Sequence, residues 1–199
     1  MMEQRTEEWF KQRLGHLTAS RASDALAKPG TATRRNYAIQ LVTERLTGLQ
    51  SESFTNAAMQ WGTEQEPIAR AAYEAHTGVF IEQTGFHKHP TIKWLGASPD
   101  GFAGDGLIEI KCPNSNTHVD YLISEEVPTK YKPQMMTQLL VTGRAWCDFV
   151  SFDPRLPDHL QLFVIRYEPT QDELKTLQSQ LEIFLAEVNV MEQSLCQRI

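Results

Sequence analysis

One stretch, from Ser98 to Pro113, constrains the fold of this 199-residue chain more than any other segment. Its sequence, SPDGFAGDGLIEIKCP, predicts a β-hairpin whose tight connection begins at Asp100 and Gly101, with later glycines where positive φ is favourable. Residues 107–112 then form a short strand with a proline behind it. Alternation along this strand places Leu107, Glu109 and Lys111 on one face and Ile108, Ile110 and Cys112 on the other.

Three charged side chains, Asp100, Glu109 and Lys111, converge at this hairpin. Carboxylate oxygens suit Mg²⁺, which takes its remaining ligands from water and a phosphate substrate. A lysine beside the metal can hold a hydroxide or offset charge in a phosphoryl transition state. Alternating strands normally place their charges in water, so Glu109 and Lys111 could also be an ordinary solvated face. The pattern therefore supports either a metal-dependent hydrolytic site or solvated charge.

The composition is typical of one globular domain spanning residues 1–199, with 41% hydrophobic and 22% charged residues. No apolar run approaches the roughly 18 residues of a membrane span, and the first four residues are unlike a secretory signal. The three cysteines, Cys112, Cys147 and Cys196, are widely spaced, which argues against a zinc ribbon or a disulfide scaffold. We therefore expect a cytoplasmic protein with no membrane association.

The net charge of −6 argues against a protein that coats nucleic acid non-specifically, but the charge is unevenly distributed. Residues 1–45 carry a local charge of +3, and residues 168–199 carry −4. An acidic protein can still bind a polyanion through a local basic lining.

The remaining pattern predicts an α/β fold with a mixed central sheet. Helices are expected at residues 6–14, after Thr18 or Ser20 as a cap, and at 33–47, 56–77, 130–142 and 170–192. The helix at 56–77 would be kinked or restarted at Pro67, with Ala57, Ala58, Trp61, Ala69, Ala72 and Tyr73 in its core stripe. Strands are expected at 79–83, 86–89, 93–97, 107–112, 146–152 and 160–166. Residues 50–55 read as a polar linker, and 114–128 as a loop with at most a short helix around Tyr121.

Several polar residues have two interpretations on local grounds. The short helix at Ser20, with Arg13 behind it, could take a phosphate, or Ser20 could only cap and Arg13 only pair with a surface acid. Gln134 and Gln138, one helical turn apart, are ordinary polar residues or donors to a phosphate. Glu66 is a solvated helix acid or a carboxylate near a metal.

Two further pairs are also ambiguous. Arg34 and Arg35 oppose the dipole at a helix start, which indicates a DNA-facing site or a solvated turn. His87 and His89 share a strand face, but no third ligand is near, so half-buried structural residues are favoured over a zinc site.

Five motifs occur in a fixed order between about residues 6 and 167, with only the last helix outside them. They are Trp9 with Arg13-Leu14-Gly15 and Thr18-Ala19-Ser20, then Trp61-Gly62-x-x-x-Glu66, Ser98-Pro99-Asp100-Gly101, Glu109-x-Lys111-Cys112-Pro113, and Gln134. Together they resemble the phage lambda exonuclease-like alkaline exonucleases, the YqaJ-type viral recombinases of the PD-(D/E)xK nuclease superfamily. One departure is Gln138, where many members of the superfamily have tyrosine four residues after the glutamine.

The resemblance implies a restriction-endonuclease-like core and a Mg²⁺-dependent exonuclease. Such an enzyme digests one strand of double-stranded DNA from the 5′ end, leaves a 3′ overhang and works beside a single-strand annealing protein. It also implies residue roles. Asp100 would hold two Mg²⁺ ions, for which Mn²⁺ would substitute, and Glu109 and the carbonyl of Ile110 would complete one shell. Lys111 would orient the attacking water and Glu66 would assist as an outer ligand or base. Arg13, Ser20 and Gln134 would bind the 5′-phosphate.

Two other functions compete with this one: an endonuclease of the same superfamily, and a DNA-end-binding module without catalysis. The resemblance further implies a toroidal homotrimer. A ring needs only a basic channel, which reconciles the net charge with DNA binding. We expect Lys28, Arg34 or Arg35 near the channel, and the acidic C-terminal helix on the outside or at a subunit contact.

Overall fold

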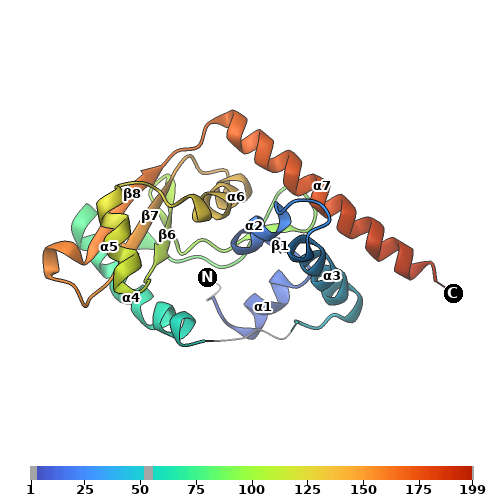
Figure 1. Ribbon diagram of the computed structural model, residues 1–199, viewed down its shortest axis with the longest axis horizontal. Helices are drawn as coiled ribbons and strands as arrows, with labels where there is room; N and C mark the ends of the chain where they lie inside the picture. The colour runs from blue at the N-terminus through green and yellow to red at the C-terminus, as the bar shows by residue number, and fades with distance from the viewer. Residues whose placement is uncertain (1–3, 52–55, 199) are drawn as a thin grey trace.

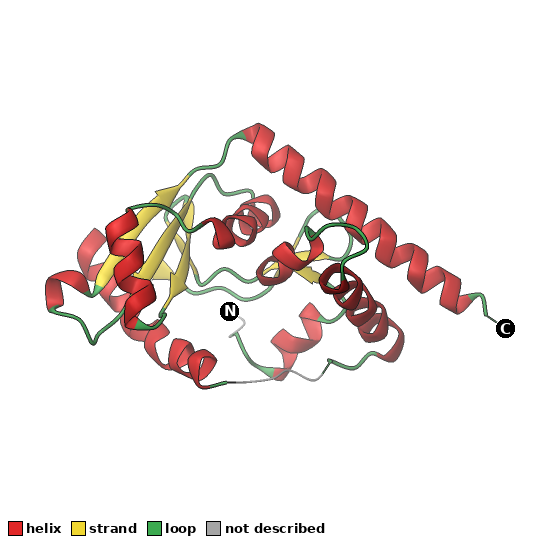
Figure 2. Cartoon of the chain, viewed as in Figure 1, coloured by secondary structure: helices red, strands yellow, loops and turns green. Residues whose placement is uncertain are grey.

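The computed structural model of the protein describes residues 4–51 and 56–198 (Figure 1). Its centre is a five-stranded sheet built from β2 (Ile81–Glu82), β5 (Gly101–Ala103), β6 (Gly106–Lys111), β7 (Cys147–Phe152) and β8 (Leu162–Tyr167). The strands lie in the order β2-β5-β6-β7-β8, in which β6 and β7 are parallel and the other pairs antiparallel. Helices cover both faces (Figure 2). The expected α/β fold with a mixed central sheet is therefore confirmed.

The alternation along β6 determines what covers each face of this sheet. Ile108 and Ile110 point to one face, where helix α4 (Ala57–Thr77) packs on them. Leu107 lies on the opposite face, beneath helices α5 (Ser115–Ser124) and α6 (Lys132–Thr142). Because a helix layer lies over its face, the Glu109 residue is only 1% exposed. The interpretation of Glu109 as part of a solvated strand face is wrong.

A second core lies beside the central sheet. It surrounds a three-stranded sheet of β1 (Leu17–Thr18), β4 (Leu95–Ala97) and β3 (His87–Lys88), in which β4 is the middle strand. Helices α2 (Ala22–Ala25), α3 (Ala32–Thr47) and α7 (Gln171–Cys196) bury their apolar faces in this core. The remaining elements are α1 (Glu7–Arg13) and the 3₁₀ turns η1 (Ala19–Arg21), η2 (Thr129–Tyr131) and η3 (Asp158–Leu160).

The ends of the helices follow the expected capping residues. The Thr6 side chain accepts a hydrogen bond from the backbone of Trp9, and Thr170 forms a reciprocal capping box with Glu173. Helices α3, α4 and α6 each end at a glycine with positive φ, namely Gly48, Gly78 and Gly143. The helix boundaries predicted from these glycines are confirmed. None of the helices among residues 4–51 and 56–198 is long and apolar enough to cross a membrane.

Two arginines of α3 form ion pairs with the acidic helix α7. Arg34 donates from Nε and Nη2 to the Glu187 carboxylate at 2.9 and 2.8 Å, and it also donates to the carbonyl of Ala25. Arg45 donates to Glu192 at 3.1 Å. Arg34 is 7% exposed, so it forms neither a solvated turn nor a surface for DNA. That expectation for Arg34 is corrected, because its charge is matched by an acid 153 positions later in the chain.

Four further details differ from the sequence prediction. Gly101 belongs to strand β5 and pairs with Ile108, so the tight connection of the hairpin lies after Ala103 and not at Asp100. Residues 115–124 form the ten-residue helix α5, which includes Tyr121 and is longer than the short helix expected there. Pro67 lies inside one continuous helix, so the alternative in which the helix restarts there is wrong, whereas the expected kink stays a prediction. The first turns of α4 are exposed, and its buried residues are Ala69 and Tyr73. Part of the linker expected at 50–55 lies outside the described residues.

Candidate active site

A cleft of about 850 Å³ runs past the ends of β5 and β6 and is lined by every residue to which the sequence assigns a catalytic, metal-binding or 5′-phosphate-binding role. These residues come from α1, η1, α4, the β5–β6 hairpin and α6. They are Arg13, Ser20, Glu66, Asp100, Glu109, Ile110, Lys111 and Gln134. The structure therefore brings together side chains that are up to 121 positions apart in the sequence.

The β5–β6 hairpin positions the two central carboxylates. Gly101 pairs with Ile108, which places Asp100 beside Glu109 across the hairpin. The Asp100 Oδ2 atom accepts a hydrogen bond of 2.7 Å from the backbone N–H of Ile110. Asp100 is thereby fixed against the strand that carries the second acid.

Glu109 is buried and held from three sides. Gln134 and Gln138, on adjacent turns of α6, donate to its Oε1 and Oε2 atoms, each at 2.6 Å. The ammonium group of Lys111 forms an ion pair with the same carboxylate. Gln138 is fully buried, and its own Oε1 atom has no hydrogen-bond partner in the part of the chain that is described. An unpaired buried amide oxygen is unfavourable, which indicates that Gln138 is placed for its contact with Glu109.

Burial and mutual repulsion govern the electrostatics of the site. Burial and the charge of Glu109 raise the pKa of Asp100 well above its ordinary value. Burial opposes the charge of Lys111, but the carboxylates of Glu109 and Asp100 outweigh it and raise the pKa of Lys111. Two neighbouring acids therefore share one lysine, and an added cation would relieve their repulsion.

The donor set fits a hard divalent cation. Among the described residues, no group of three or more His, Cys, Asp or Glu side chains is arranged to hold a metal ion. Mg²⁺ requires fewer protein ligands, because it is commonly bound by one or two carboxylates together with water and substrate phosphate oxygens. Asp100 and Glu109 supply these two carboxylates, and Ile110 lines the same cleft. The ligand role of the Ile110 carbonyl stays a prediction.

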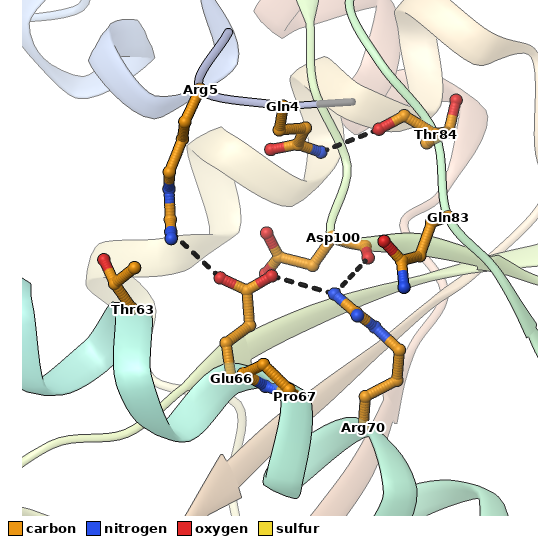
Figure 3. A pocket seen from close by; sticks show the side chains of 9 residues that line it. All are labelled: Gln4, Arg5, Thr63, Glu66, Pro67, Arg70, Gln83, Thr84 and Asp100. Atoms are coloured by element: carbon orange, nitrogen blue, oxygen red, sulfur yellow. Dashed lines mark hydrogen bonds and ion pairs between the residues drawn. The ribbon is translucent and has the colours of Figure 1, made fainter. Parts of the chain in front are cut away.

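Glu66 lies at the edge of the cleft, where a smaller cavity of about 190 Å³ adjoins it (Figure 3). Its carboxylate accepts hydrogen bonds from Arg5 at 3.0 Å and from Arg70 at 2.9 Å. Arg70 also approaches the backbone carbonyl of Asp100 at 3.4 Å. Glu66 therefore stands beside Asp100 with its charge already paired by two arginines, and its part in catalysis stays a prediction.

Arg13 and Ser20 line another wall of the cleft. The guanidinium of Arg13 lies 4.0 Å from the ring centroid of Trp9, and its Nη1 atom donates to Ser98 at 3.1 Å. Burial lowers the pKa of Arg13 to about 10, so the group remains cationic at neutral pH. Ser20 is exposed, and its hydroxyl lies 3.3 Å from that of Thr18. Gln134 contacts Glu109 and not this pair, so its predicted role with phosphate is untested.

The structure also adds residues to which the sequence assigns no role. Ser98 joins Trp9 and Arg13 through its hydroxyl group. Arg155 and Trp61 line the cleft and contact each other. The motif spacing marks Ser98 and Trp61, whereas no local signal marks Arg155. The two histidines have structural contacts, His87 with Thr84 and His89 with the backbone of Ile92.

The profile of the YqaJ-like viral recombinase domain matches residues 8–145. The chain belongs to this family. The alkaline exonuclease LHK-Exo of Laribacter hongkongensis has a similar crystal structure, with a TM-score of 0.90, 47% identity and 97% of each chain covered. A structure of LHK-Exo in complex with dAMP matches with a TM-score of 0.90 at 48% identity, over 96% of each chain.

Two matches of lower identity to this YqaJ-like protein extend the comparison. A phage-related exonuclease from Haemophilus somnus 129PT shares the fold, with a TM-score of 0.73, 13% identity, and 90% of this chain and 96% of that chain covered. An uncharacterized protein of Acanthamoeba polyphaga mimivirus, R354, is 30% identical over 164 residues, or 75% of this chain. The match spans only 29% of the length of that curated relative.

Proposed function

We propose that this YqaJ-like protein is a Mg²⁺-dependent exonuclease that digests one strand of linear double-stranded DNA from its 5′ end and leaves a 3′ overhang. The observation that carries the proposal is the grouping of Asp100, Glu109 and Lys111 in a cleft with Arg13 and Ser20 on its wall. Family membership supports a nuclease, and so does the likeness to an alkaline exonuclease. The relative in complex with dAMP held a nucleoside monophosphate, the kind of product that an exonuclease releases.

The residues of the cleft have distinct parts in this mechanism. Asp100 and Glu109 would hold Mg²⁺, whose charge would offset theirs and supply Lewis-acid stabilisation of the phosphoryl oxygens. Gln134 and Gln138 keep the Glu109 carboxylate in one orientation. Lys111, charged at neutral pH, holds the attacking water and offsets the negative charge that develops on the scissile phosphate. Glu66 assists from the rim as an outer ligand or base.

The proposed direction of digestion depends on a terminal phosphate that binds to Arg13. Its guanidinium is fixed against Trp9 and Ser98, and a preorganised guanidinium is a strong partner for a terminal phosphate. Ser20 adds a hydroxyl donor in the same cleft. We infer that a 5′-phosphate seated here places the adjacent phosphodiester at the carboxylates.

The assembly is proposed on the family membership and the charge distribution. A cyclic homotrimer around the duplex would keep DNA bound during sustained digestion and leave the acidic surface outside. Lys28 and Arg35 are exposed and could contact DNA in the channel of the ring. Arg34 could not, because it is buried and paired with Glu187. The 3′ overhang would pass to a single-strand annealing protein in the cytoplasm. Light scattering tests the ring, because a trimer has three times the 22.7 kDa mass of one chain.

A strand-resolved digestion tests the proposed function. The substrates are a linear duplex with a 5′-phosphate, the same duplex with a 5′-hydroxyl, and a closed circle. We expect Mg²⁺-dependent loss of the 5′-ended strand, faster from the phosphate end, with the circle intact. Cleavage of the circle would indicate an endonuclease of the same superfamily, and binding without digestion would indicate an end-binding module.

A further inference from the structure

Arg155 is rigidly held at the cleft. It follows strand β7, where the carboxylate of Asp153 accepts hydrogen bonds from its backbone N at 3.0 Å, its Nε at 2.7 Å and its Nη2 at 3.0 Å. Its Nη2 atom also donates to the carbonyl of Pro113 at 3.0 Å. The Asp153 side chain is fully buried, whereas that of Arg155 is 45% exposed. Asp153 and the carbonyl of Pro113 therefore hold the Nε and Nη2 atoms of Arg155, and the rest of its guanidinium group is accessible.

The accessible part of this guanidinium group faces the cleft that holds the carboxylates. The guanidinium carbon of Arg155 lies 4.5 Å from the ring centroid of Trp61, and both residues line the cleft. Burial alone would raise the pKa of Asp153, but hydrogen bonds from Arg155 and Ser115 outweigh it and lower this pKa to about 2. The pair is therefore ionised at neutral pH. The Nη1 atom of Arg155 has no hydrogen-bond partner among residues 4–51 and 56–198.

This arrangement repeats the one at Arg13. Each arginine lies over a tryptophan of the same cleft, at 4.0 Å for Arg13 on Trp9 and 4.5 Å for Arg155 on Trp61. Arg13 contacts Ser98, two positions before Asp100, and Arg155 contacts Pro113, two positions after Lys111. In the sheet, β6 lies between β5, which Asp100 directly precedes, and its parallel neighbour β7, after which Arg155 follows. The reactive carboxylates are thus flanked by two preorganised guanidinium groups.

We propose that Arg155, seated on Trp61, is a second phosphate-binding residue that holds a backbone phosphate of duplex DNA on the side of the carboxylates away from Arg13. This inference rests on the proposed function. A guanidinium fixed by a buried carboxylate loses little conformational freedom when it binds phosphate, and the free Nη1 atom supplies the donors. Contacts with backbone phosphates carry no sequence information, so they suit an enzyme that advances along a strand of any sequence.

The test measures duplex binding at several salt concentrations in an Asp100→Asn background, in which DNA is not digested. The main variant combines Asp153→Asn with Arg155→Met, which keeps the aliphatic stem on Trp61 and leaves the net charge unchanged. We expect the Kd to rise about tenfold, as for the loss of one charged hydrogen bond, and the salt slope to fall by about one. In the active enzyme the same pair of changes should raise KM and preserve kcat.

Arg144→Met is the matched control. Arg144 also lies over an aromatic ring, 3.9 Å from the centroid of Phe102, and donates to the carbonyl of Gly104, but it is not among the residues that line the cleft. Its Kd and salt slope should stay close to those of the parent, although this change does alter the net charge. Arg155→Lys keeps the cation and should give an intermediate Kd with the parental salt slope.

If the double variant binds DNA like Arg144→Met, with the same salt slope, Arg155 is only a clamp for the Pro113 segment and the inference is wrong. If the double variant does not fold, Arg155→Lys decides: a parental Kd would overturn the inference, and an intermediate one would support it. A parent protein that neither binds nor digests duplex DNA would instead overturn the proposed function.

Discussion

The central sheet carries two sets of acids that differ in how their charge is matched. On β7, Asp148 is 3% exposed and accepts hydrogen bonds from Tyr73 at 2.8 Å and from Arg166 at 2.8 and 3.1 Å. At the β5–β6 hairpin, Asp100 and Glu109 share Lys111 between them. Asp148 has a full set of partners, whereas Asp100 and Glu109 have one lysine for two carboxylates.

This difference separates a structural contact from a functional one. A buried ion pair that satisfies its hydrogen bonds joins two elements and needs nothing more. Repulsion between two buried carboxylates opposes folding unless a ligand supplies the missing charge, and such sites are where function is concentrated. We therefore expect substitutions in the two clusters to act on different properties.

The largest effect is expected at the hairpin. Asp100→Ala or Glu109→Ala should lower kcat by about a thousandfold or more, because each removes a group that stabilises charge in the transition state. Asp100→Ala should keep its stability and DNA binding, since the change removes repulsion. Glu109→Ala should still fold and bind DNA but be less stable, because Gln138 and Lys111 lose their acceptor. Steady-state digestion measures kcat, and circular dichroism shows whether each variant is folded. Turnover near that of the wild type in either variant would show that the substituted carboxylate takes no part in the mechanism.

The same substitution at the other cluster should have the opposite profile. Asp148→Ala leaves the hydroxyl of Tyr73 buried without its acceptor and Arg166 without its partner, and should lower the free energy of unfolding by about 2 kcal/mol. Urea denaturation measures this change. Activity per folded molecule should not change. A thousandfold loss of kcat in a folded Asp148→Ala protein would show that the two clusters are not functionally separate.

A smaller effect is expected when the support of Glu109 is weakened. Gln138→Met keeps the volume of the side chain but removes its hydrogen bond to Oε2. The Mg²⁺ concentration for half-maximal activity should rise about tenfold, as for the loss of an outer-shell partner of a metal ligand. Gln134→Met is the comparison, because it should alter the 5′-phosphate preference as well. An unchanged Mg²⁺ requirement together with lower stability would make Gln138 a packing residue only.

The smallest effect concerns the pH dependence of stability without metal. Because the pKa of Asp100 is raised in the folded state, the folded protein retains a proton that the unfolded chain has lost. The free energy of unfolding should therefore fall as the pH rises above the ordinary carboxyl pKa.

Asp100→Asn removes this dependence, so its stability relative to the wild type should increase from pH 5 to pH 8, by about 1.4 kcal/mol for each unit by which the folded-state pKa of Asp100 exceeds 5. Denaturant unfolding in the presence of a chelator measures it. Asp148→Asn should be less stable than the wild type at both pH values. If the difference in unfolding free energy between wild type and Asp100→Asn is the same at pH 5 and pH 8, the pKa of Asp100 is not raised in the folded protein.

Local sequence accounts for much of the fold and of the site. Threonine caps, glycine ends and the alternation of β6 are short-range features, and the boundaries that they predict agree closely with the structure. The ordered motifs predict which residues line the cleft. Partners distant in the sequence could not be predicted. The pairing of Arg34 with Glu187 spans 153 positions, and no local pattern relates the two.

The same limit applies to the contacts inside the site. The spacing of Gln134 and Gln138 predicts that they share a helix face, but their common acceptor, Glu109, depends on how α6 packs over the sheet. Arg155 lies outside every motif, and only the folded chain shows that it contacts Trp61. The partners in the folded chain thus distinguish Asp148 from Asp100, although in the sequence each is a single acid within or next to a strand.

Mg²⁺ binding in the absence of DNA, followed by isothermal titration calorimetry, tests the central claim most directly. Wild type and Asp148→Asn should bind the ion alike, because the charge of Asp148 is already matched by Tyr73 and Arg166. Asp100→Asn and Glu109→Gln should each lose binding, with folding intact. Binding that persists in both hairpin variants, or that is lost in folded Asp148→Asn, would contradict the assignment of Asp100 and Glu109 as the metal ligands.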